Sequence, residues 1–234
     1  MLVVKNLFWL FSDMIIVIDG PAGSGKSSTA KAIAEILDIE YLDSGALYRA
    51  VTYVWLEQGK PGFETFFNIL ADADLETRYC NQTFYVYVNG EDITREIRTS
   101  RVADHVSDVA SNPEARSFVN RYMRTLVTSG IYIADGRDLG SAVFPDADLK
   151  FYMDASLDER AKRRHIELKD FQDDVSFQEV RNNLRKRDLL DSNRQADPLK
   201  KDKDAVLIDT TDISFEEQIE LMVSIIRERL ELKS

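Results

Sequence analysis

The sequence predicts an α/β fold in which five parallel strands form one sheet with helices on both faces. Short segments rich in apolar and β-branched residues are typical of buried parallel strands, at residues 15–19, 39–43, 131–135, 149–154 and 205–209. Helical patterns lie between most of these segments, and this alternation favours a parallel sheet. With 234 residues, the chain is long enough for one well-buried domain, which we place at 14–234.

The first strand leads into a glycine-rich stretch that fits the phosphate-loop pattern G-x-x-x-x-G-K-[ST], namely Gly20, Pro21, Ala22, Gly23, Ser24, Gly25, Lys26 and Ser27, with Ser28 after it. Apolar residues at helical spacing from Ala30 to Leu37 follow. Backbone N–H groups in such a turn converge on phosphates, and the helix N-terminus adds positive charge. Lys26 would reach the β- and γ-phosphates of a nucleoside triphosphate, and Ser27 would bind Mg²⁺. A plain tight turn is the alternative, which the complete motif and its flanks disfavour.

The next part of the chain departs from the strand–helix alternation. A helix is expected from Asp43-Ser44-Gly45 to about Glu57, and a shorter one over 63–73. Residues 75–79 and 83–88 then show strand patterns, and Asn89-Gly90 is a strong hairpin signal. An antiparallel hairpin does not belong in a run of strand–helix units, so we interpret about 65–100 as an inserted subdomain. Helices are expected at 100–111 and 113–128.

Three Ser-x-x-Glu capping boxes mark helix starts in the C-terminal part, at 156–159, 176–179 and 214–217. The first two boxes begin charged helices. The third begins the last helix, whose apolar stripe from Ile219 to Leu230 is expected to pack on the core.

Composition restricts the possible partners and location. The net charge of −11 argues against an extended nucleic-acid interface, and no stretch is long enough to span a bilayer. The segment 7–11 is apolar, but it lacks the length and the cleavage site of a secretory signal. We interpret residues 1–13 as a dispensable extension or a misassigned start, and we expect a cytoplasmic, monomeric protein.

Charged residues at one predicted strand end favour a ligand site. Arg137 and Asp138 directly follow the strand 131–135, at the edge where open α/β sheets bind ligands. An arginine there suits a phosphate, and an aspartate suits a base or a ribose. A plain turn with a surface ion pair is the alternative.

Two further charged groups lie in the predicted charged helices. Arg160, Arg163 and Arg164 crowd together with Lys162, and a bound anion would relieve their repulsion. A solvated helix balanced by nearby acids is the alternative. Arg187, Asp191 and Arg194 would share one helix face at i, i+4 and i+7, although a surface ion pair with one extra arginine would give the same pattern.

The chain shows no Ser-His-Asp or Cys-His arrangement and no metal-ligand cluster in its sequence. This suits a phosphate acceptor, because a phosphate monoester has its second pKa near 6 and is already a nucleophile at pH 7. Phosphoryl transfer to it requires positioning and charge neutralisation more than a general base. Lysine, several arginines and Mg²⁺ would be sufficient, whereas a hydroxyl acceptor would more often require a positioned aspartate.

From Met14 to the C-terminus the sequence resembles the bacterial cytidylate kinases, nucleoside monophosphate kinases that act on CMP and dCMP. The resemblance rests on segments that occur in the family's order, at 18–28, 42–49, 90–93, 96–99, 135–140 and 144–147, completed by Arg187, Asp188, Asp191 and Arg194. The phosphate loop alone is shared by many families, whereas the complete set is highly specific. The inserted hairpin also matches.

The resemblance implies the reaction and a role for each matching residue. ATP with Mg²⁺ would occupy the phosphate loop, and CMP would be phosphorylated to CDP. Arg49, Arg137 and Arg187 would bind the CMP phosphate, and Asp191 the sugar hydroxyls. Ser44 would lie beside the nucleotide. The cytosine would be surrounded by Ser107, Arg116, Asp138 and Arg194.

The resemblance also implies a helical lid over about 156–192, whose Arg160, Arg163 and Arg164 would close over the triphosphate. With Lys26, Arg137 and Arg187, these arginines form the expected catalytic set.

Two alternative functions remain open on the sequence. One is a phosphate-loop kinase with another small acceptor such as UMP or AMP. The other is a GTP-binding switch, which would require an Asn-Lys-x-Asp motif that the sequence lacks.

Overall fold

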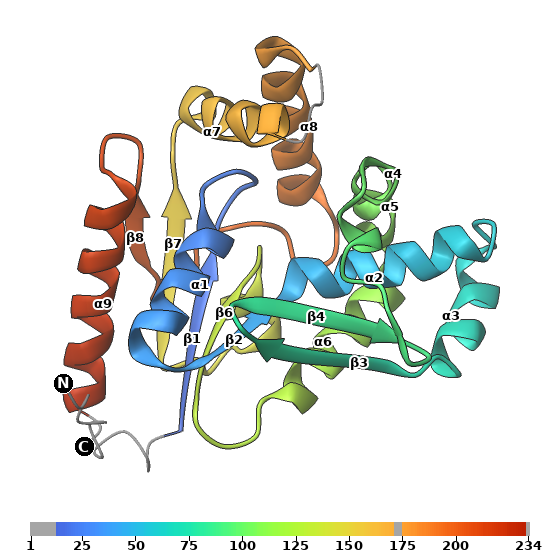
Figure 1. Ribbon diagram of the computed structural model, residues 1–234, viewed down its shortest axis with the longest axis horizontal. Coiled ribbons are helices and arrows are strands. Elements are labelled where there is room, and N and C mark those ends of the chain that lie inside the picture. The colour runs from blue at the N-terminus through green and yellow to red at the C-terminus, as the bar shows by residue number, and fades with distance from the viewer. Residues whose placement is uncertain (1–12, 171–174, 233–234) are drawn as a thin grey trace.

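The computed structural model describes residues 13–170 and 175–232, so most of the predicted N-terminal extension lies outside the described residues. Five parallel strands form the central sheet in the order β2-β6-β1-β7-β8 (Figure 1). They are β1 (Met14–Asp19), β2 (Glu40–Asp43), β6 (Ile131–Asp135), β7 (Leu149–Asp154) and β8 (Val206–Asp209). Ile16 of β1 pairs with Ile133 of β6 and with Leu149 of β7. The predicted parallel sheet is confirmed.

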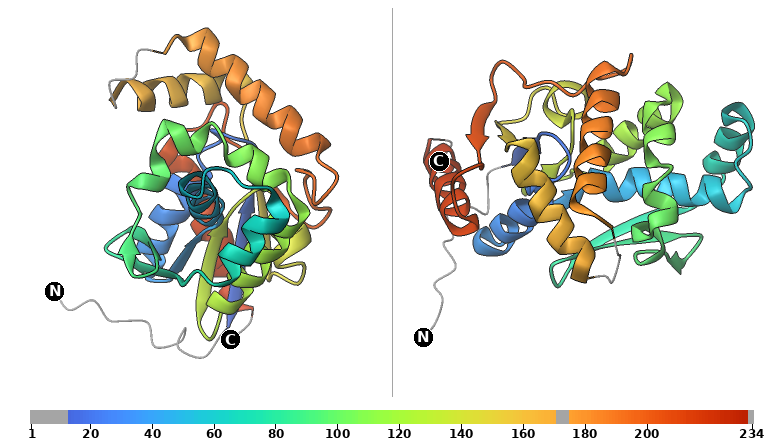
Figure 2. Two further views of the ribbon diagram at one scale, coloured as in Figure 1. Left: turned by 90° about the vertical axis from the view of Figure 1, so that its right-hand side faces the viewer. Right: turned by 90° about the horizontal axis from the view of Figure 1, so that it is seen from above.

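Helices cover both faces of this sheet. Helices α1 (Lys26–Leu37) and α9 (Phe215–Glu231) pack together on one face, and α6 (Pro113–Leu126) lies on the other (Figures 1 and 2). The predicted capping boxes of α8 (Phe177–Asn193) and α9 are complete. At the start of α7 (Leu157–Asp170), Ser156 accepts from the N–H of Glu159, but the Glu159 carboxylate pairs with Lys162 and Arg163.

The predicted hairpin forms a second, three-stranded sheet beside α2 (Ser44–Glu57) and α3 (Phe63–Ala71). Strands β3 (Leu75–Cys80), β4 (Thr83–Val88) and the two-residue β5 (Glu91–Asp92) pair antiparallel. Asn89 and Gly90 turn the chain with φ of 52° and 79°, the left-handed values that such a turn requires. Phe84 is buried with its ring edge against Tyr41 of β2, so the hairpin packs onto the main core.

The predicted helix 100–111 is two helices, α4 (Ser100–Ala103) and α5 (Val106–Ser111), after a 3-10 turn at Glu96–Arg98. The break falls at His105, whose Nδ1 lies 3.0 Å from the Arg101 carbonyl oxygen and whose Nε2 lies 2.6 Å from Lys60 Nζ. The Lys60 contact comes from a segment 45 positions away, so the sequence pattern alone does not show it.

Helices α7 and α8 pack against one another beyond the carboxyl ends of the strands (Figure 1). Helix α8 continues to Asn193, with Arg194 as its C-cap. The predicted single face carrying Arg187, Asp191 and Arg194 is therefore present, and it ends beside the carboxyl edge of the sheet.

Candidate active site

Each strand of the main sheet ends in an aspartate, and these carboxylates line the edge where the site forms: Asp19, Asp43, Asp135, Asp154 and Asp209. The first three lie close to one another because β1, β6 and β2 are neighbours, with Ile18 beside Asp135 and Asp43 beside Asp135. This repeated strand ending was visible in the sequence. Which of these carboxylates lie close together depends on the strand order, which the sequence does not specify.

The phosphate loop, Gly20–Ser27, connects β1 to the first turn of α1, as predicted. Gly20 has a φ of 149°, and a Cβ there would overlap the carbonyl oxygen of Met153 in β7, so only glycine fits. Lys26 Nζ donates to the Pro21 carbonyl at 2.6 Å and to Ser24 Oγ at 3.2 Å. Burial, and then the positive charge of Arg137, hold the pKa of Lys26 well below its usual range. A phosphate at this loop would compensate that charge.

Ser27 and Asp135 form an oxygen pair at the mouth of the loop. Ser27 Oγ donates to Asp135 Oδ2 at 2.7 Å, and the Tyr41 hydroxyl donates to Asp135 Oδ1 at 2.6 Å. Burial and the nearby Asp43 raise the pKa of Asp135. Asp135 is not among the residues predicted for the site from the sequence. The available signal was its position at the end of a buried strand, directly before Gly136 and Arg137.

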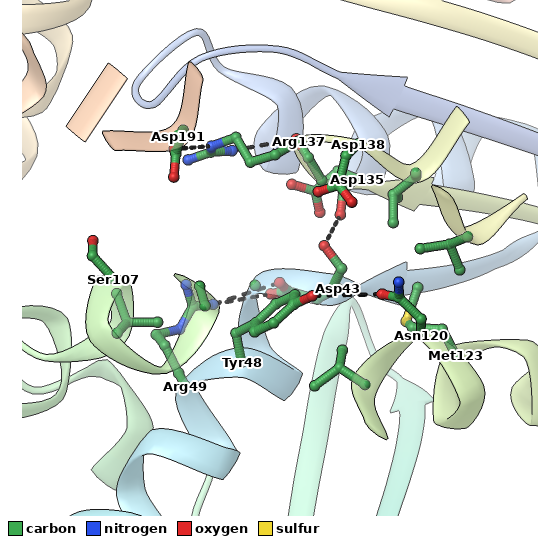
Figure 3. Close-up of a pocket in the computed structure, with 18 of the residues that line it drawn as sticks. Asp43, Tyr48, Arg49, Ser107, Asn120, Met123, Asp135, Arg137, Asp138 and Asp191 are labelled. Carbon is green, nitrogen blue, oxygen red and sulfur yellow. Dashed lines mark hydrogen bonds and ion pairs between the residues drawn. The ribbon is translucent and has the colours of Figure 1, made fainter. Parts of the chain in front are cut away.

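A central pocket lies between the ends of β2 and β6 and helices α2, α5, α6 and α8 (Figure 3). Almost all residues predicted for the second substrate line it: Ser44, Arg49, Ser107, Arg137, Asp138, Arg187, Asp191 and Arg194. Ser44 is held by a 2.7 Å hydrogen bond from its hydroxyl to the Asp135 carbonyl. The pocket also includes Tyr48, Asn120 and Met123, for which the sequence offered no signal because they come from helix faces with ordinary core patterns.

The pocket concentrates arginine charge that its carboxylates only partly balance. Arg137 Nε donates to Asp191 Oδ2 at 3.2 Å, and Arg49 Nη2 lies 3.4 Å from Asp43 Oδ2 across the pocket (Figure 3). Arg187 also lines the pocket, and burial, and then the like charge of Arg137, lower its pKa to about 10. A cation held in this way is stabilised by an incoming anion.

Arg116, the remaining predicted residue, lies behind the pocket wall. Its side chain is 2% exposed, and its Nη2 donates to Asp138 Oδ2. Arg194 Nη2 donates to the other oxygen of Asp138 at 2.6 Å. Asp138 is therefore held between two guanidinium groups, while burial is the main cause that raises its pKa. Arg116 would act on a pocket ligand through Asp138.

The three predicted lid arginines have partners within the chain. Arg160 donates to the carbonyls of Ala22 and Ala155 and pairs with Asp188 at 2.8 Å. Arg163 donates to Thr210 and pairs with Glu159, and Arg164 pairs with Glu167. Acids on α7 and α8 balance these charges, as expected for the alternative of a helix balanced by nearby acids. Arg160 nevertheless contacts the phosphate loop directly.

Asp19, the last residue of β1, forms hydrogen bonds with the segment that follows Asp138. Its two carboxylate oxygens accept from the N–H groups of Leu139 and Gly140, each at 2.8 Å, at the start of the π-helical turn Leu139–Val143. Burial outweighs these bonds and raises the pKa of Asp19 from 3.8 to about 6.

This pKa predicts a pH-dependent contribution of Asp19 to stability. Between pH 3.8 and pH 6 the folded protein retains the Asp19 proton more strongly than the unfolded chain, so ionisation destabilises the fold as pH rises. We expect the stability of the wild type relative to Asp19→Asn to fall by about 2 kcal/mol from pH 4.5 to pH 7.5. Urea unfolding of both proteins at the two pH values measures this, and a constant or rising difference would contradict it.

The phosphate loop and the arginine-lined pocket lie at the same edge of the sheet. Together they define the class of this protein: it is a phosphate-loop kinase. The family model described as cytidylate kinase matches residues 16–228. Cytidylate kinases of Geobacillus sp. strain WCH70 and of Anoxybacillus flavithermus are each 41% identical to the chain, over 92% of its length and 97% of theirs. The chain belongs to the cytidylate kinase family, and the resemblance seen in the sequence is confirmed.

A solved structure supports the fold independently. A gluconokinase from Sinorhizobium meliloti 1021 superposes with a TM-score of 0.52 at 13% identity, covering 96% of this chain and 99% of that one. In the part of the chain that the structure describes, no helix has the length and apolar character required to cross a membrane.

Proposed function

We propose that the protein transfers the γ-phosphoryl group of ATP to CMP or dCMP, giving ADP and CDP or dCDP. The observation that carries this proposal is the partly balanced arginine charge at Arg137 and Arg187, beside the phosphate loop. An acceptor phosphate bound there would neutralise these charges and would lie close to a triphosphate held by the loop. Membership in the cytidylate kinase family supports the nucleotide.

The donor side would be formed by residues 20–28. Ser27 and Asp135 present oxygen atoms 2.7 Å apart at the loop, which are the hard ligands that Mg²⁺ prefers. They fit a Mg²⁺ ion that arrives with the nucleotide, and such an ion would neutralise charge on the phosphates. Lys26 would exchange its Pro21 carbonyl partner for phosphate oxygens.

The acceptor side would bind CMP at three points. Arg49, Arg137 and Arg187 would hold the phosphate, and Asp191 the sugar hydroxyls, with Ser44 beside the nucleotide. Asp138 would accept from the exocyclic amine of cytosine, where uracil carries a carbonyl. Arg194 and Ser107 would complete the base site, with Arg116 acting from behind Asp138.

No general base is needed for this transfer, because the acceptor phosphate is itself the nucleophile. The arginines align it and neutralise the charge that develops as the phosphoryl group moves in line between the two substrates. Arg160, Arg163 and Arg164 would close over the triphosphate and exclude water that would otherwise hydrolyse ATP.

We further propose the division of the chain that this mechanism requires. Residues of about 65–100 would form the inserted part of the monophosphate side, and about 156–192 the lid. The family match begins at residue 16, which supports a dispensable extension over 1–13. We propose a cytoplasmic monomer that binds neither nucleic acid nor membranes.

A substrate panel tests the assignment. ADP release would be measured with CMP, dCMP, UMP, AMP and GMP as acceptors, and turnover should be greatest with CMP or dCMP. Equal or greater turnover with UMP or AMP would instead support a kinase for another small acceptor. Slow hydrolysis of GTP without any acceptor would support the GTP-binding switch.

Asp138→Ala tests the base site separately. This change removes the group that distinguishes an amine from a carbonyl, so we expect the ratio of kcat/KM for CMP to that for UMP to fall by about tenfold or more. The KM for ATP should change little, because Asp138 lies outside the phosphate loop. An unchanged ratio would remove Asp138 from base recognition.

A further inference from the structure

Asp197 lies in the segment between α8 and β8, next to the charge cluster formed by Arg116, Asp138 and Arg194. Its φ of 47° is in the left-handed region, which is uncommon for any residue except glycine, and the next residue is Pro198. Its side chain is 36% exposed, whereas the three cluster residues are 2%, 6% and 5% exposed. Neither the sequence motifs nor the proposed reaction assigns Asp197 a role.

Asp197 contacts both arginines of the cluster with different atoms. Its carboxylate oxygen Oδ2 accepts from Arg116 Nε at 2.9 Å, and its backbone carbonyl accepts from Arg194 Nε at 2.8 Å. Each guanidinium therefore has its Nε edge occupied and directs Nη2 to one oxygen of Asp138. One residue thus orients two cations symmetrically about a single carboxylate.

We propose that Asp197 is a positioning residue for base recognition: it holds Arg116 and Arg194 so that Asp138 remains available to the base. This inference rests on the proposed function, in which Asp138 reads the cytosine amine. Each oxygen of Asp138 receives one guanidinium, which leaves acceptor capacity on both for a ligand in the pocket.

Removing the Asp197 carboxylate would change the cluster in two ways. Arg116 would lose its Nε partner in a fully buried position, where an unpaired donor is costly. The guanidinium would compensate by turning toward Asp138, with which a bidentate pair is the favoured geometry. Oδ1 of Asp138 would then accept from both Arg116 and Arg194, and the base would lose the acceptor capacity on that oxygen.

The test compares two substitutions that tolerate the unusual backbone. Asp197→Gly retains the positive φ and the carbonyl that accepts from Arg194, but it removes the bond to Arg116 Nε. Asp197→Asn also tolerates positive φ and keeps an acceptor for that bond, without the charge. Lys200→Gly, at an exposed position of the same segment, controls for added chain flexibility.

For Asp197→Gly we expect the KM for CMP to rise by about tenfold, and the CMP-to-UMP ratio of kcat/KM to fall by about the same factor. The KM for ATP should stay within about twofold, because the phosphate loop is untouched. Asp197→Asn should restore most of the ratio, and Lys200→Gly should leave it unchanged.

Failure of this inference is distinguishable from failure of the proposed function. If Asp138→Ala lowers the CMP-to-UMP ratio and Asp197→Gly does not, the positioning role is overturned while the base site stands. If Asp138→Ala leaves the ratio unchanged, both the proposed base site and this inference are contradicted. Equal increases in KM for CMP, UMP and ATP with Asp197→Gly would show a general structural role, which also overturns the inference.

Discussion

Lys26→Met is expected to lower kcat by about a thousandfold or more, equally with CMP and with UMP. Lys26 is the buried cation of the phosphate loop, and its side chain is held by the loop's own Pro21 carbonyl and Ser24 hydroxyl. Methionine fills similar volume without charge, so the loop should keep its shape and lose its charge on the transferred phosphoryl group. In the proposed mechanism the loop would contact only the donor, so the effect should not depend on the acceptor.

Steady-state assays with both acceptors and thermal unfolding measure this prediction. Lys31→Met is the matched control, because Lys31 lies on the same helix near the Tyr41 ring and outside the loop. It should retain nearly full activity. A Lys26→Met enzyme with kcat within about tenfold of wild type would show that Lys26 is not essential to transfer.

Local patterns explain why the fold and the donor loop were predictable. The apolar run of β1, the glycine pattern after it and the helical spacing of α1 all lie within 24 consecutive residues, Met14–Leu37, and each is decided by nearby chemistry. The Asn89-Gly90 turn was predictable for the same reason, since its left-handed φ values favour those residue types.

The features that sequence reasoning missed depend on partners far along the chain. Asp135 joins the proposed donor site through its hydrogen bond with Ser27, which lies 108 positions away in the sequence. Arg116 likewise pairs with Asp138 and Asp197, which lie far from it along the chain. Arg160, one of the predicted lid arginines, is balanced by Asp188, which lies on another helix. Tertiary pairing of charges has no local signature.

Arg187→Gln should separate function from stability most clearly. Burial and Arg137 lower the pKa of Arg187 to about 10, which means that its charge is unfavourable in the fold until an anion arrives. Glutamine removes that charge, so thermal stability should stay the same or rise. The kcat/KM for CMP should fall by about a hundredfold to a thousandfold, because the acceptor phosphate loses a charged partner.

The donor side should be nearly unaffected, with the KM for ATP within about threefold of wild type. Arg185→Gln is the matched control, since Arg185 is on the same helix and exposed. It should change neither kinetics nor stability measurably. If Arg187→Gln lowered stability and left kcat/KM for CMP intact, the Arg187 charge would stabilise the fold. The acceptor phosphate would then have to be bound elsewhere. Loss of activity without loss of stability would identify Arg187 as a cation that the fold holds for its substrate.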